Sequence, residues 1–181
     1  MVAGGVLLLT GVPGIGKTTV IRRVADRLRG RRLAGFYTEE IREQGDRRGF
    51  RVVGFDGTAR VIAHVDFPKV HRVGKYGVDV EAIDGAGDRL GLDPAEVYLV
   101  DEIGKMECLS DRFVSGMRAL LAGPQPVVAT IALHGSGFIE EVKRGTCAVI
   151  REVTHANREK LPVQVLGWLT GSSRRECHSR S

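Results

Sequence analysis

Eight residues near the start of the sequence have the types and spacing of a loop that binds phosphate groups. They are Gly11, Val12, Pro13, Gly14, Ile15, Gly16, Lys17 and Thr18, in the pattern G-x-x-x-x-G-K-[ST]. Glycines let the backbone curl so that successive N–H groups point at phosphate oxygens, and a following helix adds its positive N-terminal end. Lys17 would then reach the β and γ phosphates, Thr18 would coordinate Mg²⁺, and Thr19 would meet the α-phosphate. The segment therefore predicts a site for a nucleotide with Mg²⁺.

Two adjacent carboxylates, Asp101 and Glu102, follow the apolar run Val97–Val100. In an open α/β sheet, ligands bind beyond the carboxyl ends of the strands. Phosphoryl transfer requires cations that neutralise the phosphates and a group that orients the attacking oxygen. We therefore predict Asp101 as a second Mg²⁺ ligand and Glu102 as the residue that polarises a water molecule. The alternative is an acidic pair that ends a strand in solvent and caps the segment after it.

The segment Asp101–Gly104 also fits D-x-x-G, the γ-phosphate switch pattern of regulatory GTPases. The sequence lacks the base-reading motif N-K-x-D, for which Asn157–Lys160 is a poor substitute. The regulatory GTPase interpretation is weaker for that reason.

A third positive group is often needed to stabilise the charge of the transition state. Lys105, three residues after Glu102, is placed to point back toward the phosphates, and Arg144 and Arg158 are alternatives. A solvated surface charge is the competing interpretation for each of them. Thr130 is placed to sense the γ-phosphate, although threonine is also an ordinary strand residue.

Apolar runs of strand length alternate with helical patterns and would position these residues. Strands are predicted over Val6–Thr10, Leu33–Thr38, Val97–Asp101, Val127–Leu133 and Cys147–Val153. Four of these runs are nearly continuous, which is typical of strands that are buried on both faces. Amphipathic helices are predicted over Lys17–Arg29 and Asp111–Ala122. The pattern predicts an α/β fold of three layers with a mostly parallel central sheet.

One region follows a different pattern and predicts a small antiparallel β insertion. Its alternating segments are Glu39–Glu43, Gly49–Phe55 and Ala59–Val65, separated by Gln44–Arg48 and by the turn dipeptide Asp56-Gly57. Gly74–Val80 is interpreted as a strand or a loop, and Glu81–Leu92 as a glycine-interrupted helix. We expect one domain over residues 1–170 and a disordered or appended tail over 171–181.

The composition is that of an ordinary globular protein, with 181 residues, 43% hydrophobic and 27% charged, which excludes collagen-like and disordered classes. The formal net charge is +5. Six arginines lie in Arg22–Arg32, which we interpret as a solvated helix face; nucleic-acid binding is less favoured because no aromatic residues are interleaved. Three widely spaced cysteines argue against a disulfide framework or a zinc site. No apolar stretch reaches the length of a membrane span, so we expect a reduced, cytoplasmic protein without a membrane partner.

Taken in order, these segments resemble the THEP-type nucleoside-triphosphatase family, the cancer-related nucleoside triphosphatase group of P-loop NTPases. The resemblance covers roughly residues 5–170. It rests on Gly11–Thr19, Gly35–Arg42, Gly49-Phe50, Gly74–Asp79, Asp101–Glu107, Ala129–Ile131 and Asn157-Arg158. The first segment is common to all P-loop proteins, whereas Asp101–Glu107 and Gly35–Arg42 together are specific to this family. The sequence departs from the family pattern at Ala132–Gly135 and in the tail.

The resemblance implies a RecA-like P-loop core that hydrolyses the β–γ bond of ATP, GTP, CTP and UTP with weak base preference. It implies Mg²⁺ as the cofactor and Glu102 as the residue that activates water. It places nucleotide contacts on Gly11–Thr18 and on Val100, Asp101, Glu102, Ile103, Gly104 and Lys105. Two other function classes stay open, namely a nucleotide or small-molecule kinase, in which an acceptor hydroxyl replaces the water, and a nucleic-acid-linked regulatory ATPase module. The oligomeric state is left open.

Overall fold

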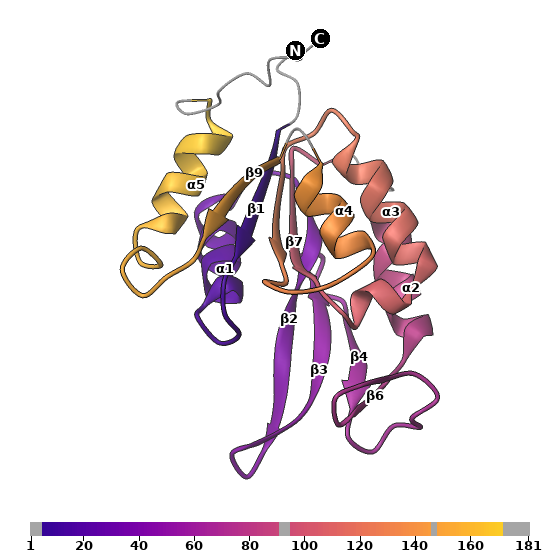
Figure 1. Ribbon diagram of the computed structural model, residues 1–181. Coiled ribbons are helices and arrows are strands. Elements are labelled where there is room, and N and C mark those ends of the chain that lie inside the picture. Colours follow the sequence, from indigo (N-terminus) through magenta and orange to yellow (C-terminus); the bar gives the residue numbers. More distant parts are fainter. Residues whose placement is uncertain (1–4, 91–94, 146–147, 172–181) are drawn as a thin grey trace.

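The computed structural model describes residues 5–90, 95–145 and 148–171, and a long twisted sheet forms its centre (Figure 1). The nine described strands lie in the order β5-β6-β4-β3-β2-β7-β8-β1-β9. They are β1 (Val6–Thr10), β2 (Leu33–Glu43), β3 (Asp46–Gly54), β4 (Ala59–His64), β5 (Arg72–Val73), β6 (Tyr76–Val78), β7 (Val97–Ile103), β8 (Val127–Ile131) and β9 (Ala148–Glu152). The five strands from β2 to β9 in this order pair in parallel, and the other four pair antiparallel.

Helices cover both faces of the sheet, which confirms the predicted α/β fold (Figure 1). The helices are α1 (Lys17–Arg27), α2 (Val80–Arg89), α3 (Asp111–Leu121), α4 (Phe138–Arg144) and α5 (Leu161–Leu169), with a 3₁₀ turn η1 (Glu107–Leu109) before α3. Helices α1 and α5 lie on one face, and α2, α3 and α4 lie on the other. Helices α4 and α5 were not predicted. Within the described part of the chain, no helix is both long and apolar enough to span a membrane.

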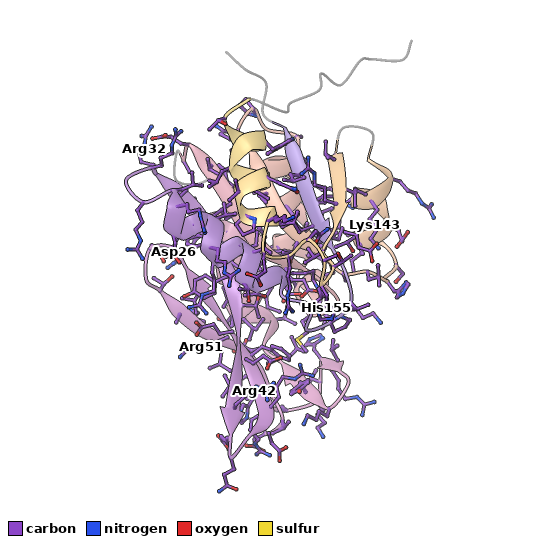
Figure 2. The ribbon with its side chains drawn as sticks, turned by 90° about the vertical axis from the view of Figure 1, so that its left-hand side faces the viewer. Asp26, Arg32, Arg42, Arg51, Lys143 and His155 are labelled. Carbon is purple, nitrogen blue, oxygen red and sulfur yellow. The ribbon has the colours of Figure 1, made fainter. Side chains whose placement is uncertain are left out.

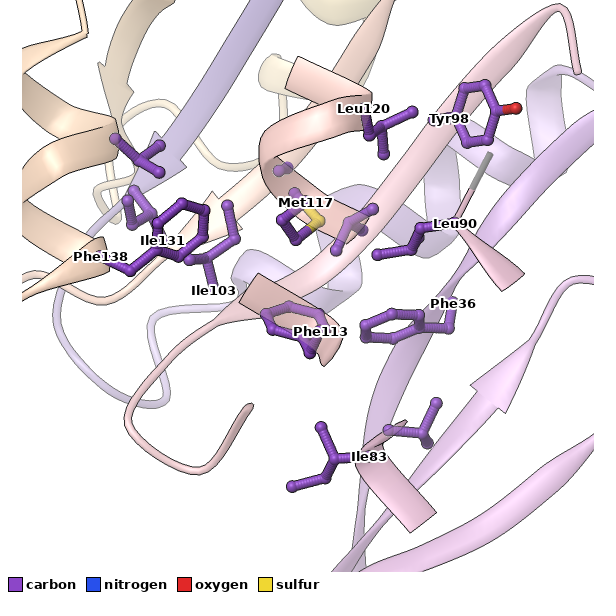
Figure 3. Close-up of a cluster of buried hydrophobic side chains, with 14 of the residues drawn as sticks. Phe36, Ile83, Leu90, Tyr98, Ile103, Phe113, Met117, Leu120, Ile131 and Phe138 are labelled. Carbon is purple, nitrogen blue, oxygen red and sulfur yellow. The ribbon is translucent and has the colours of Figure 1, made fainter. Parts of the chain in front are cut away.

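Each face of the sheet has its own hydrophobic core, because successive strand residues point to opposite faces. In β1, Leu7 and Leu9 pack with α1 and α5, whereas Val6 and Leu8 belong to the cluster under α2, α3 and α4. Figure 3 shows that second cluster, where the rings of Phe36 and Phe113 lie 6.2 Å apart. Strand β1, whose carboxyl end leads into the phosphate loop, is therefore packed on both of its faces.

The predicted antiparallel segments are present and lengthen the central sheet. Strand β2 runs without a break from Leu33 to Glu43, pairing with β7 at its start and with β3 along the rest. The turn between β2 and β3 is shorter than Gln44–Arg48, because Gln44 and Gly45 alone have positive φ (50° and 90°). Two consecutive residues with positive φ match the twist of a tight hairpin, so pairing resumes at Asp46.

Strand β9 differs from the other strands of the parallel part, because it lies at the edge of the sheet. Strands β1, β7 and β8 are buried almost throughout, as predicted. In β9, Val149 and Ile150 are 40% and 43% exposed, so this strand is not buried on both faces. The described strand begins at Ala148, and Cys147 lies outside the described residues.

The predicted glycine-interrupted helix is α2, and its glycines serve close packing against α3. A Cβ on Gly87 would lie 2.6 Å from the Cα of Phe113, and one on Gly116 would lie 2.7 Å from the carbonyl oxygen of Gly87. The two helix backbones therefore approach more closely than side chains would allow. Of the predicted tail over 171–181, only Gly171 is among the described residues.

Candidate nucleotide and metal site

The loop Gly11–Gly16 between β1 and α1 has the curled backbone that its glycines predict (Figure 1). Gly11, Gly14 and Gly16 have φ of 150°, 78° and 109°, values that L side chains rarely adopt. A Cβ on Gly11 would also lie 2.8 Å from the carbonyl oxygen of Val153. Gly16 precedes the first turn of α1, so the positive end of that helix faces the loop. The loop is built to receive an anion.

Lys17 lies against this loop and is only 8% exposed. Its Nζ donates a 3.2 Å hydrogen bond to the carbonyl oxygen of Gly11. An ammonium group held this far from water interacts strongly with any negative charge that enters the loop. The position agrees with the predicted contact of Lys17 with phosphate oxygens.

Asp101 is the centre of a buried group of hydroxyls contributed by three other segments. It is 1% exposed, and its Oδ1 accepts a 2.6 Å hydrogen bond from Thr130 Oγ1 while its Oδ2 accepts one of 2.6 Å from Thr18 Oγ1. The backbone N–H of Thr38 lies 3.3 Å from Oδ2, and Thr38 Oγ1 donates to the carbonyl oxygen of Asp101 at 2.6 Å. Burial raises the pKa of Asp101, and the hydrogen bonds from Thr130, Thr18 and Thr38 and the charge of Lys17 act in the opposite direction.

The fold brings these four residues together for a simple topological reason. Strands β1, β7 and β8 are parallel neighbours, so their carboxyl ends meet at one edge of the sheet, and β2 pairs with β7 on the other side. Thr130 therefore reaches Asp101 from β8 and Thr38 from β2, while Thr18 reaches it from the first turn of α1. The alternative that Asp101 only ends a strand in solvent is wrong.

The residues present fit a magnesium ion. Thr18 and Asp101 bring a hydroxyl oxygen and a carboxylate oxygen within 2.6 Å of each other beside the phosphate loop. Mg²⁺ prefers oxygen ligands, and is bound by one or two carboxylates together with phosphates and waters. Over the described residues, no three His, Cys, Asp or Glu side chains gather as a metal cage. The donor set therefore suits a metal that a nucleotide helps to hold.

Glu102 follows Asp101, is partly exposed, and lies near enough to Lys17 for the two charges to interact. Burial raises the pKa of Glu102, the charge of Lys17 lowers it, and the charge of Asp101 raises it again. Its Cγ and Oε1 lie 3.3 Å from the point where a Cβ on Gly104 would be. A carboxylate with access to solvent at this position suits the predicted role of polarising water.

Of the three predicted cations, only Arg158 has a described contact with the phosphate loop. Its Nη1 lies 3.4 Å from the carbonyl oxygen of Ile15, and its side chain is 40% exposed. Lys105 is exposed in the turn after β7, and Arg144 is exposed in the last turn of α4. A catalytic role for Lys105 stays a prediction.

The remaining predicted contact residues differ in what they can offer a nucleotide. Val12, Pro13, Gly14 and Thr19 are exposed. The side chains of Val100 and Ile103 are fully buried in the core under α2 and α3, so any contact from them would come from backbone atoms. Two cavities, of about 610 and 800 Å³, are lined by residues outside the phosphate loop and the Asp101–Lys105 segment.

Sequence reasoning missed one residue of this site, Thr38, and one residue that lies behind it, Glu107. Thr38 and Glu107 both lie in segments that carry the family resemblance, but neither was given a role of its own. A threonine in a strand and a glutamate after a turn are common, so only the folded arrangement distinguishes them. Glu107 is 6% exposed and lies next to Glu102.

The arginine-rich helix face agrees with a solvated surface. Arg22 lies 3.6 Å from Glu39, Arg29 is 3.0 Å from Asp26, and Arg31 is 3.6 Å from Glu96. Figure 2 shows charged side chains covering α1 and continuing along β2 and β3. Exposed pairs of this kind contribute little to stability.

Comparison with known proteins shows the family to which the chain belongs. An NTPase family model matches residues 6–166. The chain belongs to this nucleoside-triphosphatase family. The nucleoside-triphosphatase THEP1 of Thermotoga petrophila is 39% identical over 163 residues, which are 88% of this chain and 90% of the relative.

Solved structures of the nucleoside-triphosphatase family have the same fold. The crystal structure of THEP1 from Aquifex aeolicus superposes with a TM-score of 0.81 at 34% identity, covering 90% of this chain and 98% of that one. The solution structure of a human cancer-related nucleoside triphosphatase superposes with a TM-score of 0.79 at 33% identity, covering 95% of this chain and all of that one. The predicted family resemblance and P-loop α/β fold are confirmed.

Proposed function

We propose that the chain is a Mg²⁺-dependent phosphohydrolase that cleaves the β–γ bond of ATP, GTP, CTP and UTP with broad base tolerance. The observation that carries this proposal is the 2.6 Å contact between Thr18 and Asp101, beside the buried Lys17. It joins the hydroxyl of the phosphate loop to the strand-end carboxylate. Family membership supports the reaction class.

Each residue of the site has a separate task in this reaction. Backbone N–H groups of Gly11–Gly16 and the ammonium of Lys17 would bind the phosphates and fix their orientation. Mg²⁺ held by Thr18 and Asp101 would neutralise charge on the phosphate oxygens. The Thr130 hydroxyl and the Thr38 backbone N–H hold the Asp101 carboxylate in place through hydrogen bonds, and the Thr38 hydroxyl holds the backbone carbonyl of Asp101. The rotamer of Asp101 is then fixed before a ligand arrives.

Glu102 would orient the water and accept its proton as the oxygen attacks the γ-phosphorus. The bond between that phosphorus and the bridging oxygen breaks, and nucleoside diphosphate leaves. The proposal of broad base tolerance is supported by the sequence, in which no N-K-x-D motif is present to read a base. The phosphates, which are common to all four nucleotides, would then supply most of the binding.

A product analysis tests this proposal against the kinase. Each of the four nucleotides is incubated with the chain and Mg²⁺, with and without candidate acceptor molecules, while free phosphate and phosphorylated acceptor are followed together. We expect free phosphate and diphosphate as the products in every case, and no turnover when EDTA removes Mg²⁺. A phosphorylated acceptor would overturn the assignment in favour of a kinase.

A further inference from the structure

Glu107 is a buried carboxyl group that the reaction described above does not use. It is 6% exposed at the start of η1, on the turn that follows β7. No ion pair with a lysine or arginine is found for it among the described residues. Burying an unpaired carboxylate is costly, so such a group is kept neutral or has a function that requires it.

The position of Glu107 is defined by Gly104, which lies between it and Glu102. A Cβ on Gly104 would be 2.8 Å from Glu107 Oε2 and 3.3 Å from Glu102 Oε1. The two carboxyl groups therefore face each other across a residue with no side chain. Burial and the charge of Glu102 raise the pKa of Glu107 to about 8, and hydrogen bonds from the backbone N–H groups of Glu107 and Gly104 lower it only in part.

The turn that carries Glu107 is fixed on both sides. Cys108 N–H donates to the carbonyl oxygen of Gly104 at 3.0 Å, and Ser110 N–H donates to that of Glu107 at 3.1 Å. Ser110 Oγ in turn contacts Asp84 of α2 and accepts from Phe113 N–H of α3. A turn anchored to two helices cannot easily move away if Glu107 acquires a charge.

The surroundings of Glu107 supply negative charge more than positive charge. The elements packed against it and its own turn carry more acids than cations. The acids are Asp101, Glu102, Glu81, Asp84, Asp88 and Asp111, and the cations are Arg89, Arg112, Arg118 and Lys105. The three arginines form ion pairs with Asp56, Asp88 and Glu141 and not with Glu107. Asp101 and Glu102 both raise its pKa. Lys105 is exposed. A proton on Glu107 therefore removes its repulsion with Glu102 and Asp101, which no ion pair of Glu107 offsets among the described residues.

We propose that Glu107 is a positioning residue for the hydrolytic step: as a neutral acid it fills the space behind Gly104 and leaves the Glu102 carboxylate aimed at the water. This inference rests on the proposed function. Ionised Glu107 would place a second negative charge beside Glu102 and push it away from the water. Turnover would fall with little change in nucleotide binding, because Glu107 does not touch the phosphate loop.

The test compares kcat and KM between pH 6 and pH 10 for the unsubstituted chain and for Glu107→Gln, with Glu43→Gln on the exposed β2–β3 hairpin as the matched control. For the unsubstituted chain and Glu43→Gln, we expect kcat to fall as pH rises through about 8, with KM nearly constant. Glutamine mimics the neutral acid, so Glu107→Gln should keep kcat at pH 7 within about threefold and lose this alkaline fall. An alkaline fall that is the same in Glu107→Gln overturns the inference.

A second measurement does not depend on turnover and separates this inference from the proposed function. The carboxyl ¹³C signals of glutamate-labelled chain are titrated by NMR, and the Glu107 signal is identified by its absence in Glu107→Gln. A midpoint near 8 supports the inference even if no nucleotide is hydrolysed, and a midpoint near the ordinary value of 4.5 overturns it. If the Gln variant does not fold, the unsubstituted chain is titrated alone. The inference is then overturned if no glutamate carboxyl signal has its titration midpoint above pH 7.

Discussion

The hydroxyl of Thr18 donates a 2.6 Å hydrogen bond to Oδ2 of Asp101, although 83 residues separate them in the sequence. The contact joins the first turn of α1 to the end of β7. It is possible because β1 and β7 flank β8 in the sheet, with their carboxyl ends at the same edge. Two oxygens that suit Mg²⁺ are therefore in place next to the phosphate loop before a nucleotide binds.

Replacement of Lys17 by alanine should weaken nucleotide binding sharply. The buried ammonium lies against the loop, and losing a hydrogen bond to a charged group weakens binding roughly 10- to 100-fold. Isothermal titration of a nonhydrolysable ATP analogue with Mg²⁺ measures the change. Lys69→Ala, an exposed lysine outside the site, is the control. Equal affinity in the Lys17 and Lys69 variants would show that the loop does not hold the phosphates as described.

Replacement of Glu102 by glutamine should suppress turnover and leave binding nearly intact. Glutamine keeps the size of the side chain but cannot accept a proton from water, so kcat should fall about 10²- to 10⁴-fold. Steady-state phosphate release and the same titration separate kcat from affinity. Unchanged turnover in this variant would remove Glu102 from the mechanism.

Thr130→Val should destabilise the chain and disturb the metal site together. Valine keeps the shape of threonine but removes the hydroxyl that bonds Asp101 Oδ1, which leaves a buried carboxylate oxygen without this donor. The expected loss is about 1–3 kcal/mol in the free energy of unfolding, with a weaker response to Mg²⁺ in the nucleotide-bound state. Urea unfolding measures the loss of stability. Phosphate release followed at increasing Mg²⁺ concentrations measures the response to the metal.

The control for this prediction is Thr130→Ser, which keeps the hydroxyl and loses only a methyl group. It should retain the Mg²⁺ response of the unsubstituted chain. If both variants lose that response equally, packing and not the hydrogen bond explains the effect.

Arg158→Ala should lower kcat more than Lys105→Ala or Arg144→Ala. Arg158 is the cation that reaches the carbonyl oxygen of Ile15, whereas the other two are exposed without a described contact to the loop. In other enzymes, removing one hydrogen-bond donor aimed at the charge that develops in the transition state lowers kcat about 10²- to 10³-fold. We expect kcat of Arg158→Ala to fall by at least about tenfold. A larger loss in the Lys105 variant would assign the role to Lys105 instead.

The stability of the chain should depend on pH through Glu107. Its pKa is about 8 in the folded chain against an ordinary value of 4.5, so the folded state keeps a proton that the unfolded state releases. The free energy of unfolding therefore falls as pH rises from about 4.5 to about 8, and this contribution levels off above about 8. In Glu107→Gln this contribution is gone, so the drop in Tm between pH 5 and pH 9 should be smaller.

Thermal unfolding at the two pH values measures this difference, with Glu43→Gln as the control. Each kcal/mol corresponds to roughly 2–4 °C for a chain of this size. An equal drop in Tm for Glu107→Gln and the unsubstituted chain would contradict a buried neutral Glu107.

The parts of the site that could be predicted from the sequence are those with a fixed local spacing. The phosphate loop and its flanking strand and helix all lie in the continuous segment from Val6 to Arg27. Asp101-Glu102 could be predicted because the end of a buried strand is recognisable from its apolar run. Each of these signals is local and has a known physical cause.

The parts that could not be predicted depend on the topology of the sheet. Thr38 meets Asp101 only because β2 is the neighbour of β7 in the sheet. The sequence predicted two segments, Leu33–Thr38 and Glu39–Glu43, where the structure has the single strand β2. Helix α5 is short and apolar, with Pro162 in its first turn and weak periodicity. Glu107 has no sequence signal of its own, since its burial arises from the turn that folds back over Gly104.

The most direct test of the central claim is turnover of MgATP and MgGTP in water labelled with ¹⁸O, with mass spectrometry of both products. Hydrolysis of the β–γ bond by attack of water on the γ-phosphorus predicts one labelled oxygen in inorganic phosphate and none in the nucleoside diphosphate. Label in the diphosphate, or transfer of the phosphoryl group to an acceptor without label in phosphate, would contradict the account.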